Sequence, residues 1–478
     1  RVSPAASPAT PFQDAIDAAA PGDLILVSPG IYNELVIMWK PVKLQGWGAA
    51  VTSINARQVP TEKITDWRAK VAQLDADGSI DPLPGQEALP GFPGLGAALF
   101  PTEEGAGVFV AGVSSGPDRF GAPANRGARV DGFTILGAST GGGIVVNGYA
   151  QFLEIGNNRL TANGGFYGGG IRVGHPTLTN EVDGLAYTDA VNDQIRIHHN
   201  HIAKNGGQLG AGGGISLHTG ADGYDVVNNW VCGNFSQGSG GGIGHLGLSN
   251  GGLIEDNYVI FNESFSQANA ESGGGIFVGD GGGIRVASAN GEDVAASPDT
   301  VTDWYRVAVF NNMVTNNVAG LAGGGISVED SLRVLIRNNT VANNDSTATT
   351  ALAFEPGAPN ISVAQPAGIV SRVNSTALAG IVGAGFSDPV LRDNIVYHNR
   401  SFYWLNYDDP ATAVIETGLY PSHCPPSGTG TVADPYVPPA TCDLTAVADY
   451  TWDLAVLSGN VDQAPTYQLD PRASLLTD

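Results

Sequence analysis

The densest group of potential metal ligands in the sequence is His198-His199-Asn200-His201. Neutral imidazoles bind transition metals, so His198, His199 and His201 are candidate metal ligands. Alternation along a strand would send His198 and Asn200 to one side and His199 and His201 to the other. The pattern therefore disfavours a single site that uses all three imidazoles.

A second set of polar residues appears when the chain is aligned on the isoleucine of a repeated Gly-Gly-Gly-Ile motif. Three or four residues beyond that isoleucine lie Asn147, His175, His218, Asp280, Glu329 and Asp330. If the isoleucine points inward, the third residue beyond it points outward, and such side chains stack about 4.8 Å apart in adjacent strands. We expect this stripe to be a solvated face, or to line a sugar-binding groove with Asp280 and Asp330 sharing a cation such as calcium.

Catalysis on a polysaccharide sets stricter requirements. A glycoside hydrolase needs two carboxylates about 5 to 10 Å apart, and Asp280 with Glu329 or Asp330 is the candidate pair on the stripe. A β-eliminating lyase needs positioned cations and a tuned base, and the nearest cations are Arg172 and Arg285. The sequence favours a non-catalytic protein, with a polysaccharide lyase or glycoside hydrolase as the alternative.

The motif behind this alignment recurs along the chain. Gly-Gly-Gly-Ile occurs at 141–144, 168–171, 212–215, 240–243, 273–276, 281–284 and 323–326. An N-x4-N box follows it, at Asn158/Asn163, Asn200/Asn205, Asn229/Asn234, Asn257/Asn262, Asn312/Asn317, Asn339/Asn344 and Asn394/Asn399. Steps of 29 (200 to 229), 28 (229 to 257) and 27 residues (312 to 339) indicate one coil per repeat. A period of this length is typical of solenoids.

Within each coil the apolar runs are short, rich in Val and Ile, and separated by Gly and Asn. This pattern favours stacked parallel strands over helices. The predicted fold class is therefore all-β, a single-stranded right-handed parallel β-helix solenoid with an N-terminal capping helix and irregular loop insertions. Gly and Asn would occupy corners with positive φ, and stacked asparagines would form side-chain amide ladders.

The opening of the chain carries a further pattern. Residues 11–19 place Phe12 and Ile16 on one helical face, and a strand at 23–27, the turn Pro29-Gly30-Ile31-Tyr32-Asn33-Glu34 and a strand at 42–46 follow. This order resembles the pectate-lyase-like superfamily, whose members begin with an amphipathic helix, a strand, a P-G-x-Y-x-E turn and a strand ending in Gly. The resemblance implies a helix that caps the open end of the solenoid. The paired catalytic aspartates of that superfamily's hydrolases are missing, because the lone Asp-Asp, Asp408-Asp409, lacks their motif context.

Composition limits the partners. The chain has 22 basic and 46 acidic residues, a net charge of −24, which opposes binding to nucleic acid or to an anionic membrane surface. No apolar stretch is long enough for a transmembrane helix. Cys424 and Cys442 flank a Pro/Gly-rich loop and are predicted to form a disulfide, as expected outside the cytoplasm. Because the chain starts at Arg1 without a signal segment, we expect a processed piece of a secreted precursor.

Four segments follow from these patterns: a cap helix with the first coils (1–56), a Pro/Gly-rich insertion (57–107), regular coils (108–400), and an aromatic, disulfide-containing cap or docking segment (401–478). The predicted function is a secreted or cell-surface scaffold that binds carbohydrate or another partner. The third possibility is an accessory segment of a larger secreted enzyme. Expected partners are a glycan, other modules of the same precursor, or a second copy of the chain, and calcium is the possible cofactor.

Overall fold

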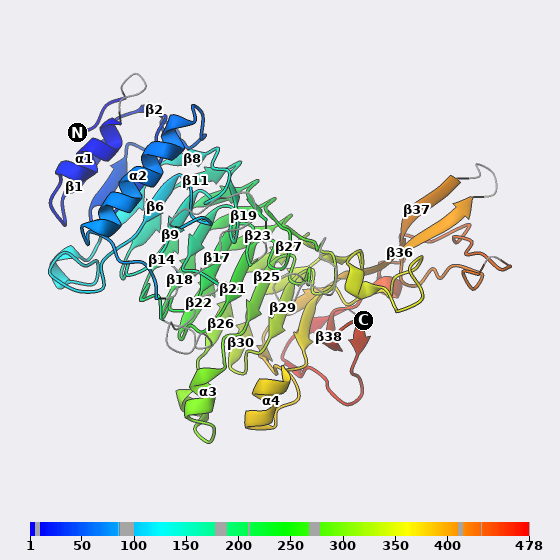
Figure 1. The fold of residues 1–478 in the computed structure, drawn as a ribbon. Helices are drawn as coiled ribbons and strands as arrows, with labels where there is room; N and C mark the ends of the chain where they lie inside the picture. Colours follow the sequence, from blue (N-terminus) through cyan, green and yellow to red (C-terminus); the bar gives the residue numbers. More distant parts are fainter. Residues whose placement is uncertain are drawn as a thin grey trace.

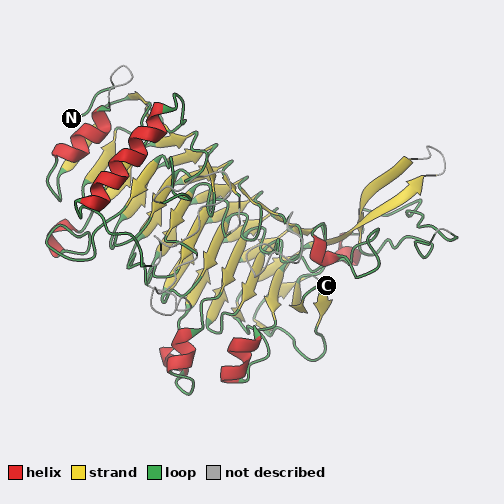
Figure 2. Cartoon of the chain, in the orientation of Figure 1, coloured by secondary structure: helices red, strands yellow, loops and turns green. Residues whose placement is uncertain are grey.

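The computed structural model describes residues 1–4, 10–84, 86, 100–176, 189–208, 211–266, 278–409, 414–431 and 433–477. The chain is mostly β and forms long parallel sheets, built from successive coils stacked along the molecule (Figure 1). Helices are few and lie at the periphery (Figure 2). They are α1 (Pro11–Ala18), α2 (Glu62–Ala76), α3 (Glu292–Ala296) and α4 (Thr376–Val382).

Each regular coil contributes one strand to each of three long sheets, which we name A, B and C. Sheet A pairs, in order, β1 (Leu24–Val27), β4 (Lys43–Gly46), β7 (Arg129–Asp131), β10 (Glu154–Gly156), β14 (Arg196–His198), β18 (Asp225–Val227), β22 (Gly252–Glu255), β26 (Val307–Phe310), β30 (Val334–Arg337), β34 (Val390–Arg392) and β40 (Pro471–Arg472). Sheet B pairs β2 (Gly30–Tyr32), β5 (Thr52–Asn55), β8 (Thr134–Leu136), β11 (Arg159–Thr161), β15 (His201–Ala203), β19 (Trp230–Cys232), β23 (Tyr258–Ile260), β27 (Met313–Thr315), β31 (Thr340–Ala342), β35 (Ile395–Tyr397) and β41 (Leu475–Leu476).

Sheet C pairs β3 (Val36–Met38), β6 (Val108–Val110), β9 (Ile144–Val146), β13 (Ile171–Val173), β17 (Ile215–His218), β21 (Ile243–Leu246), β25 (Ile284–Ala287), β29 (Ile326–Glu329), β33 (Ile369–Arg372), β38 (Leu454–Ser458) and β39 (Val461–Asp462). The shorter sheet D pairs β12 (Gly164–Gly165), β16 (Gly206–Gly207), β20 (Phe235–Ser236), β24 (Glu263–Ser264), β28 (Val318–Ala319), β32 (Asp345–Ser346), β36 (Arg400–Asp409) and β37 (Val414–Pro421). Within these sheets the antiparallel pairs are β36 with β37 and β38 with β39. Figure 1 shows the β36–β37 hairpin extending away from the stacked coils.

The isoleucines of the repeat point into the coils, as predicted. Ile144, Ile171, Ile215, Ile243, Ile284 and Ile326 lie in register along sheet C and are fully buried. The Gly-Gly-Gly-Ile copy at 273–276 lies outside the described residues. Strand β25 instead starts at Ile284, from the copy at 281–284.

The N-x4-N boxes form two buried amide ladders. In the first, Asn200 Nδ2 donates to Asn229 Oδ1 at 3.0 Å, and Asn229 Nδ2 donates to Asn257 Oδ1 at 3.0 Å. The second ladder repeats this pattern from Asn163 to Asn399, and Asn399 Nδ2 ends it on Asp453 Oδ1 at 2.7 Å. The predicted ladders are confirmed, but positive φ belongs to the residue before each ladder asparagine, for example Asn228 at 56° in the first ladder and Asn316 at 57° in the second.

Helix α1 forms where the helical periodicity predicts it, with Phe12 and Ile16 buried. The carboxylate of Glu34, from the P-G-x-Y-x-E turn, accepts the backbone N–H groups of Phe12 (3.1 Å) and Gln13 (3.0 Å). These are free N–H groups of the first helical turn, so Glu34 holds the helix N-terminus over the first coils.

Helix α2 lies in the 57–107 interval, where the sequence analysis predicted only irregular chain. Its buried residues Trp67 and Val71 pack on the outer face of sheet C together with Phe109 and Val145. The ring centroids of Trp67 and Phe109 are 5.4 Å apart. The insertion therefore covers the first strands of sheet C. Among the described residues, no helix is long and apolar enough to cross a membrane.

Candidate functional surfaces

The N-terminal part of the predicted polar stripe lies on one sheet, but it is buried. Asn147, His175 and His218 follow or end strands β9, β13 and β17 of sheet C, and each is at most 2% exposed. Asn147 exchanges two side-chain hydrogen bonds with Gln86, at 2.8 and 3.0 Å. The spacing of these residues predicts a solvated face or a sugar-binding groove instead. Chain segments outside the repeat, such as the one that carries Gln86, cover these residues and shield them from solvent.

Arg172 is the centre of the buried polar cluster on this face. Its guanidinium forms an ion pair with Glu103 and donates to the carbonyl and hydroxyl oxygens of Thr102, both at 3.2 Å. The guanidinium carbon lies 5.2 Å from the Tyr167 ring centroid, and His175 Nε2 lies 3.8 Å from Glu103 Oε1. Arg172 and Glu103 are each 1% exposed. The cluster thus joins the 100–106 segment to the coils.

The environment of the two stripe histidines, His175 and His218, disfavours their charged form. Burial lowers the pKa of His175 well below its usual range, and the positive charge of Arg172 lowers it further. Burial and Arg172 lower the pKa of His218 in the same way. Ser216 Oγ lies 2.8 Å from His218 Nε2 on the same strand. Among the described residues, no carboxylate forms a hydrogen bond with His218 Nδ1. The Ser216–His218 pair therefore lacks the third member of a catalytic triad.

The carboxylates of the predicted catalytic pair, Asp280 with Glu329 or Asp330, are each held by other contacts in the structure. Asp280 was placed by the copy at 273–276, which lies outside the described residues, and in the structure Asp280 precedes β25. It is fully buried and bound in a bidentate ion pair by Arg372, at 2.7 and 2.8 Å. Glu329 forms an ion pair with Arg285, and Asp330 Oδ1 accepts the Ser375 N–H at 2.7 Å. Because Arg372 binds both carboxylate oxygens of Asp280, the structure disfavours a calcium ion shared with Asp330.

The side chains of the three clustered histidines do not follow the strict alternation of a single strand. His201 points outward from sheet B, with its ring parallel to Trp230 at 6.5 Å. Asn200 points inward and belongs to the first ladder. His199 has a φ of 53°, which interrupts the strand and brings its Nδ1 to 3.1 Å from Nδ1 of His198. The expectation that His198 and Asn200 share a side is therefore wrong, because Asn200 is buried whereas His198 lies beside the exposed His199.

An exposed row of aromatic side chains, absent from the sequence analysis, runs along sheet B. His201, Trp230, Tyr258 and Met313 are in register on consecutive coils. Trp230 is 40% and Tyr258 48% exposed, and their rings are stacked with centroids 5.2 Å apart. Phe235, in sheet D, is 45% exposed. Phe261, at the corner that follows β23, is 61% exposed. We call the set His201, Trp230, Phe235, Tyr258, Phe261 and Met313 the aromatic track.

This track has a signal in the sequence. Each of its sheet B members directly follows the first asparagine of a box, as in Asn229-Trp230 and Asn257-Tyr258. The ladder asparagine points inward, so the next residue points outward. Reading that single position down the repeats would have predicted the row.

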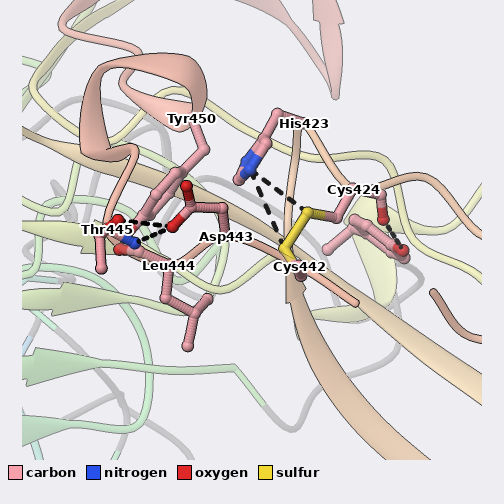
Figure 3. Close-up of a disulfide and its surroundings, with 8 residues drawn as sticks. His423, Cys424, Cys442, Asp443, Leu444, Thr445 and Tyr450 are labelled. Atoms are coloured by element: carbon pink, nitrogen blue, oxygen red, sulfur yellow. Dashed lines mark hydrogen bonds between the residues drawn. A yellow bond between two sulfur atoms is a disulfide. The ribbon is translucent and has the colours of Figure 1, made fainter. Parts of the chain in front are cut away.

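The predicted disulfide between Cys424 and Cys442 is confirmed (Figure 3). It ties the segment after the β36–β37 hairpin to the loop before Tyr450, whose ring stacks on His423 at 5.1 Å. His423, Cys424 and Cys442 are the one group of three close potential ligands among the described residues. With both sulfurs in the disulfide, no thiolate is left there to bind a metal.

No known family, no curated protein and no solved structure matches this chain.

Proposed function

We propose that this chain is a non-catalytic, extracellular scaffold whose aromatic track binds a glycan of neutral charge. The architecture we propose is a right-handed parallel β-helix of the pectate-lyase-like type, as the opening pattern of the sequence implies. Crossovers between parallel strands of one sheet are right-handed in about 98% of cases, which supports this hand. The disulfide supports an oxidising, extracellular location.

The observation that carries the proposal is the exposure of stacked aromatic rings on consecutive coils. Folded proteins seldom leave several large aromatic side chains in water side by side, and such patches are typical of binding surfaces. Centroid separations of 5.2 Å (Trp230 and Tyr258) and 6.5 Å (His201 and Trp230) are those of offset rings, whose faces are only partly covered by each other. Part of each ring face is thus open to the apolar face of a sugar.

Charge favours a neutral ligand over a polyuronate. Exposed Glu263 is the direct strand partner of Phe235, and Asp256 lies two residues before Tyr258. The whole chain carries a charge of −24. A polyanionic glycan would be repelled from this surface, whereas an uncharged one would not.

The enzyme alternative has less support. Asp280 and Glu329 each form an ion pair with an arginine, and Arg172 is itself engaged by Glu103. Catalysis would need an acid and a base that reach the substrate. Reducing-end and unsaturated-uronate assays on a polysaccharide panel are expected to detect no turnover, and turnover would contradict the proposal.

Binding to insoluble cellulose and chitin and to soluble xylan and galactomannan tests the proposal, by pull-down and by affinity electrophoresis. Replacing a buried aromatic anchor of an interface costs about 2 kcal/mol or more. Trp230→Ala and Tyr258→Ala are therefore expected to weaken binding on the order of 30-fold. Their melting temperatures should stay close to that of the wild type, because both side chains are half-exposed.

Trp47→Ala is the matched control, since Trp47 is 58% exposed and lies off the track. It is expected to bind as the wild type does. Failure of the wild type to bind any neutral polysaccharide, or an equal loss in the Trp47 variant, would contradict the proposal.

A further inference from the structure

One corner between sheets A and B carries an unusual residue. In each described coil that carries an N-x4-N box, the residue before the asparagine of the first ladder has positive φ. In six of these coils that residue is an Asn or an Asp, namely Asn157, Asn228, Asp256, Asn311, Asn338 and Asp393. In one coil it is His199, with a φ of 53°. Asn and Asp suit this backbone conformation well, so the corner itself does not require an imidazole.

The positive φ turns the His199 ring toward the ring of His198. Their Nδ1 atoms are 3.1 Å apart, and the ring planes meet at 83°. Two imidazole nitrogens that bind one ion at about 2.0 to 2.1 Å stand roughly 3 Å apart when they occupy adjacent positions. The two nitrogens are therefore at the separation that a shared ion requires. In the absence of an ion, one ring can donate an N–H to the other across the same distance.

The other edge of the His198 ring lies near Asp131, whose Oδ1 and Oδ2 accept hydrogen bonds from Gln45 and Asn157. A Cβ atom on Gly156 would lie 2.9 Å from His198 Nε2 and 3.2 Å from Asp131 Oδ2. Because residue 156 is glycine, the imidazole can lie across strand β10 toward Asp131 in β7. A carboxylate near the distal nitrogen of a metal-bound histidine orients the ring and raises its basicity.

The charges around the two rings and the exposure of the rings also affect the binding of an ion. Burial lowers the pKa of His198, and Arg196 and His199 lower it further. Glu154 and Asp131 partly offset this effect, so the ring is held as the neutral imidazole that binds metals. His198 is half-buried and His199 is exposed, so the pair lies at the surface of the protein. His201 is on another face and stacks on Trp230, which excludes it from this pair.

We propose that His198 and His199 bind a divalent transition-metal ion, Cu²⁺ or Zn²⁺, through both Nδ1 atoms. Water completes the coordination, and Asp131 positions the His198 ring. Imidazole nitrogen suits both ions, and Cu²⁺ binds more tightly than Zn²⁺ to a given set of such ligands. The site is independent of glycan binding by the aromatic track.

Titration calorimetry of tag-free protein with Cu²⁺ and with Zn²⁺ tests the site. The Zn²⁺ titration is needed because Cys232 is a free thiol, and thiols can reduce Cu²⁺. His199→Asn is the principal variant, since other coils carry Asn at this corner and fold with it. His198→Val is the second, because Val227 occupies the matching position in the next coil.

Loss of a partner that merely orients a ligand costs 10- to 100-fold in metal affinity, so loss of a ligand should cost at least about tenfold. Asp131→Asn should lower the affinity less than either histidine variant does. His201→Asn and His398→Asn are controls and should bind as the wild type does. Electron paramagnetic resonance of the Cu²⁺ form should show two coupled nitrogens in the wild type and one in His199→Asn.

No heat of binding with either ion would overturn the proposal. So would retention of binding in both His198→Val and His199→Asn, or its loss in His201→Asn.

Discussion

The outer faces of sheets C and B have the same backbone geometry and opposite surroundings. On sheet C the outward row includes Arg172 and Arg285, which are charged yet at most 4% exposed. On sheet B the outward row includes Trp230 and Tyr258, which are aromatic yet 40% and 48% exposed. Polar character thus fails to mark the accessible face of this molecule. At Arg172 the covering chain decides it, since Thr102 and Glu103 of the 57–107 insertion contact the guanidinium.

This contrast implies that charged groups of sheet C hold structure together while apolar groups of sheet B remain available to a partner. Buried ion pairs add little net stability compared with apolar packing, but removal of one partner is costly. Exposed aromatic rings gain free energy only when something covers them. Perturbing each face should therefore affect different properties.

The largest effect is expected from Arg172→Ala. This change leaves Glu103 charged and buried without its partner, which costs about 3 to 5 kcal/mol of unfolding free energy. Urea denaturation followed by tryptophan fluorescence measures it. Arg172→Met combined with Glu103→Leu should recover most of the loss, because an apolar pair of similar volume replaces the ions.

Arg337→Ala is the matched control for this prediction. Arg337 pairs with Asp393 through a side chain that is 47% exposed, and an exposed pair contributes at most about 1 kcal/mol. Equal losses of unfolding free energy for the two arginine variants would show that the Arg172–Glu103 pair is not buried as described.

A smaller effect is expected from acid. The pKa values of His175 and His218 are lowered in the folded chain, so below about pH 6.5 the unfolded chain binds protons that the folded chain does not. Their stabilising contribution is complete above that pH and falls by up to ~1.4 kcal/mol per pH unit for each histidine below it. Glu34 and Asp222 oppose this trend, because burial raises their pKa values to about 7 and about 6.

Comparison with a His175→Gln/His218→Gln variant separates these contributions. The wild type should lose more unfolding free energy than the variant between pH 7 and pH 5, since the carboxylates act equally in both proteins. Parallel stability curves over this range would mean that the two histidines are not buried as neutral groups.

Features set by the repeat were predictable from the sequence. Features that depend on an insertion or on one unusual backbone angle were not. The inward isoleucines, the asparagine ladders and the helix over Phe12 and Ile16 follow from local spacing. Asp280 was misplaced because two Gly-Gly-Gly-Ile copies lie eight residues apart, at 273–276 and 281–284. The pairing of His198 with His199 depends on one positive φ, which overrides strand alternation. Burial of the stripe depends on an insertion outside the repeat.

Hydroxyl-radical footprinting with mass spectrometry, performed with and without a bound neutral polysaccharide, tests the central claim most directly. The free protein should be strongly modified at Trp230, Tyr258 and Phe261 and protected at Trp67 and Phe109, whose exposures are 2% and 0%. The polysaccharide should protect the three track residues and leave Trp47 unchanged. Modification of Trp67 in the free protein, or protection by the polysaccharide anywhere but on the track, would contradict the account.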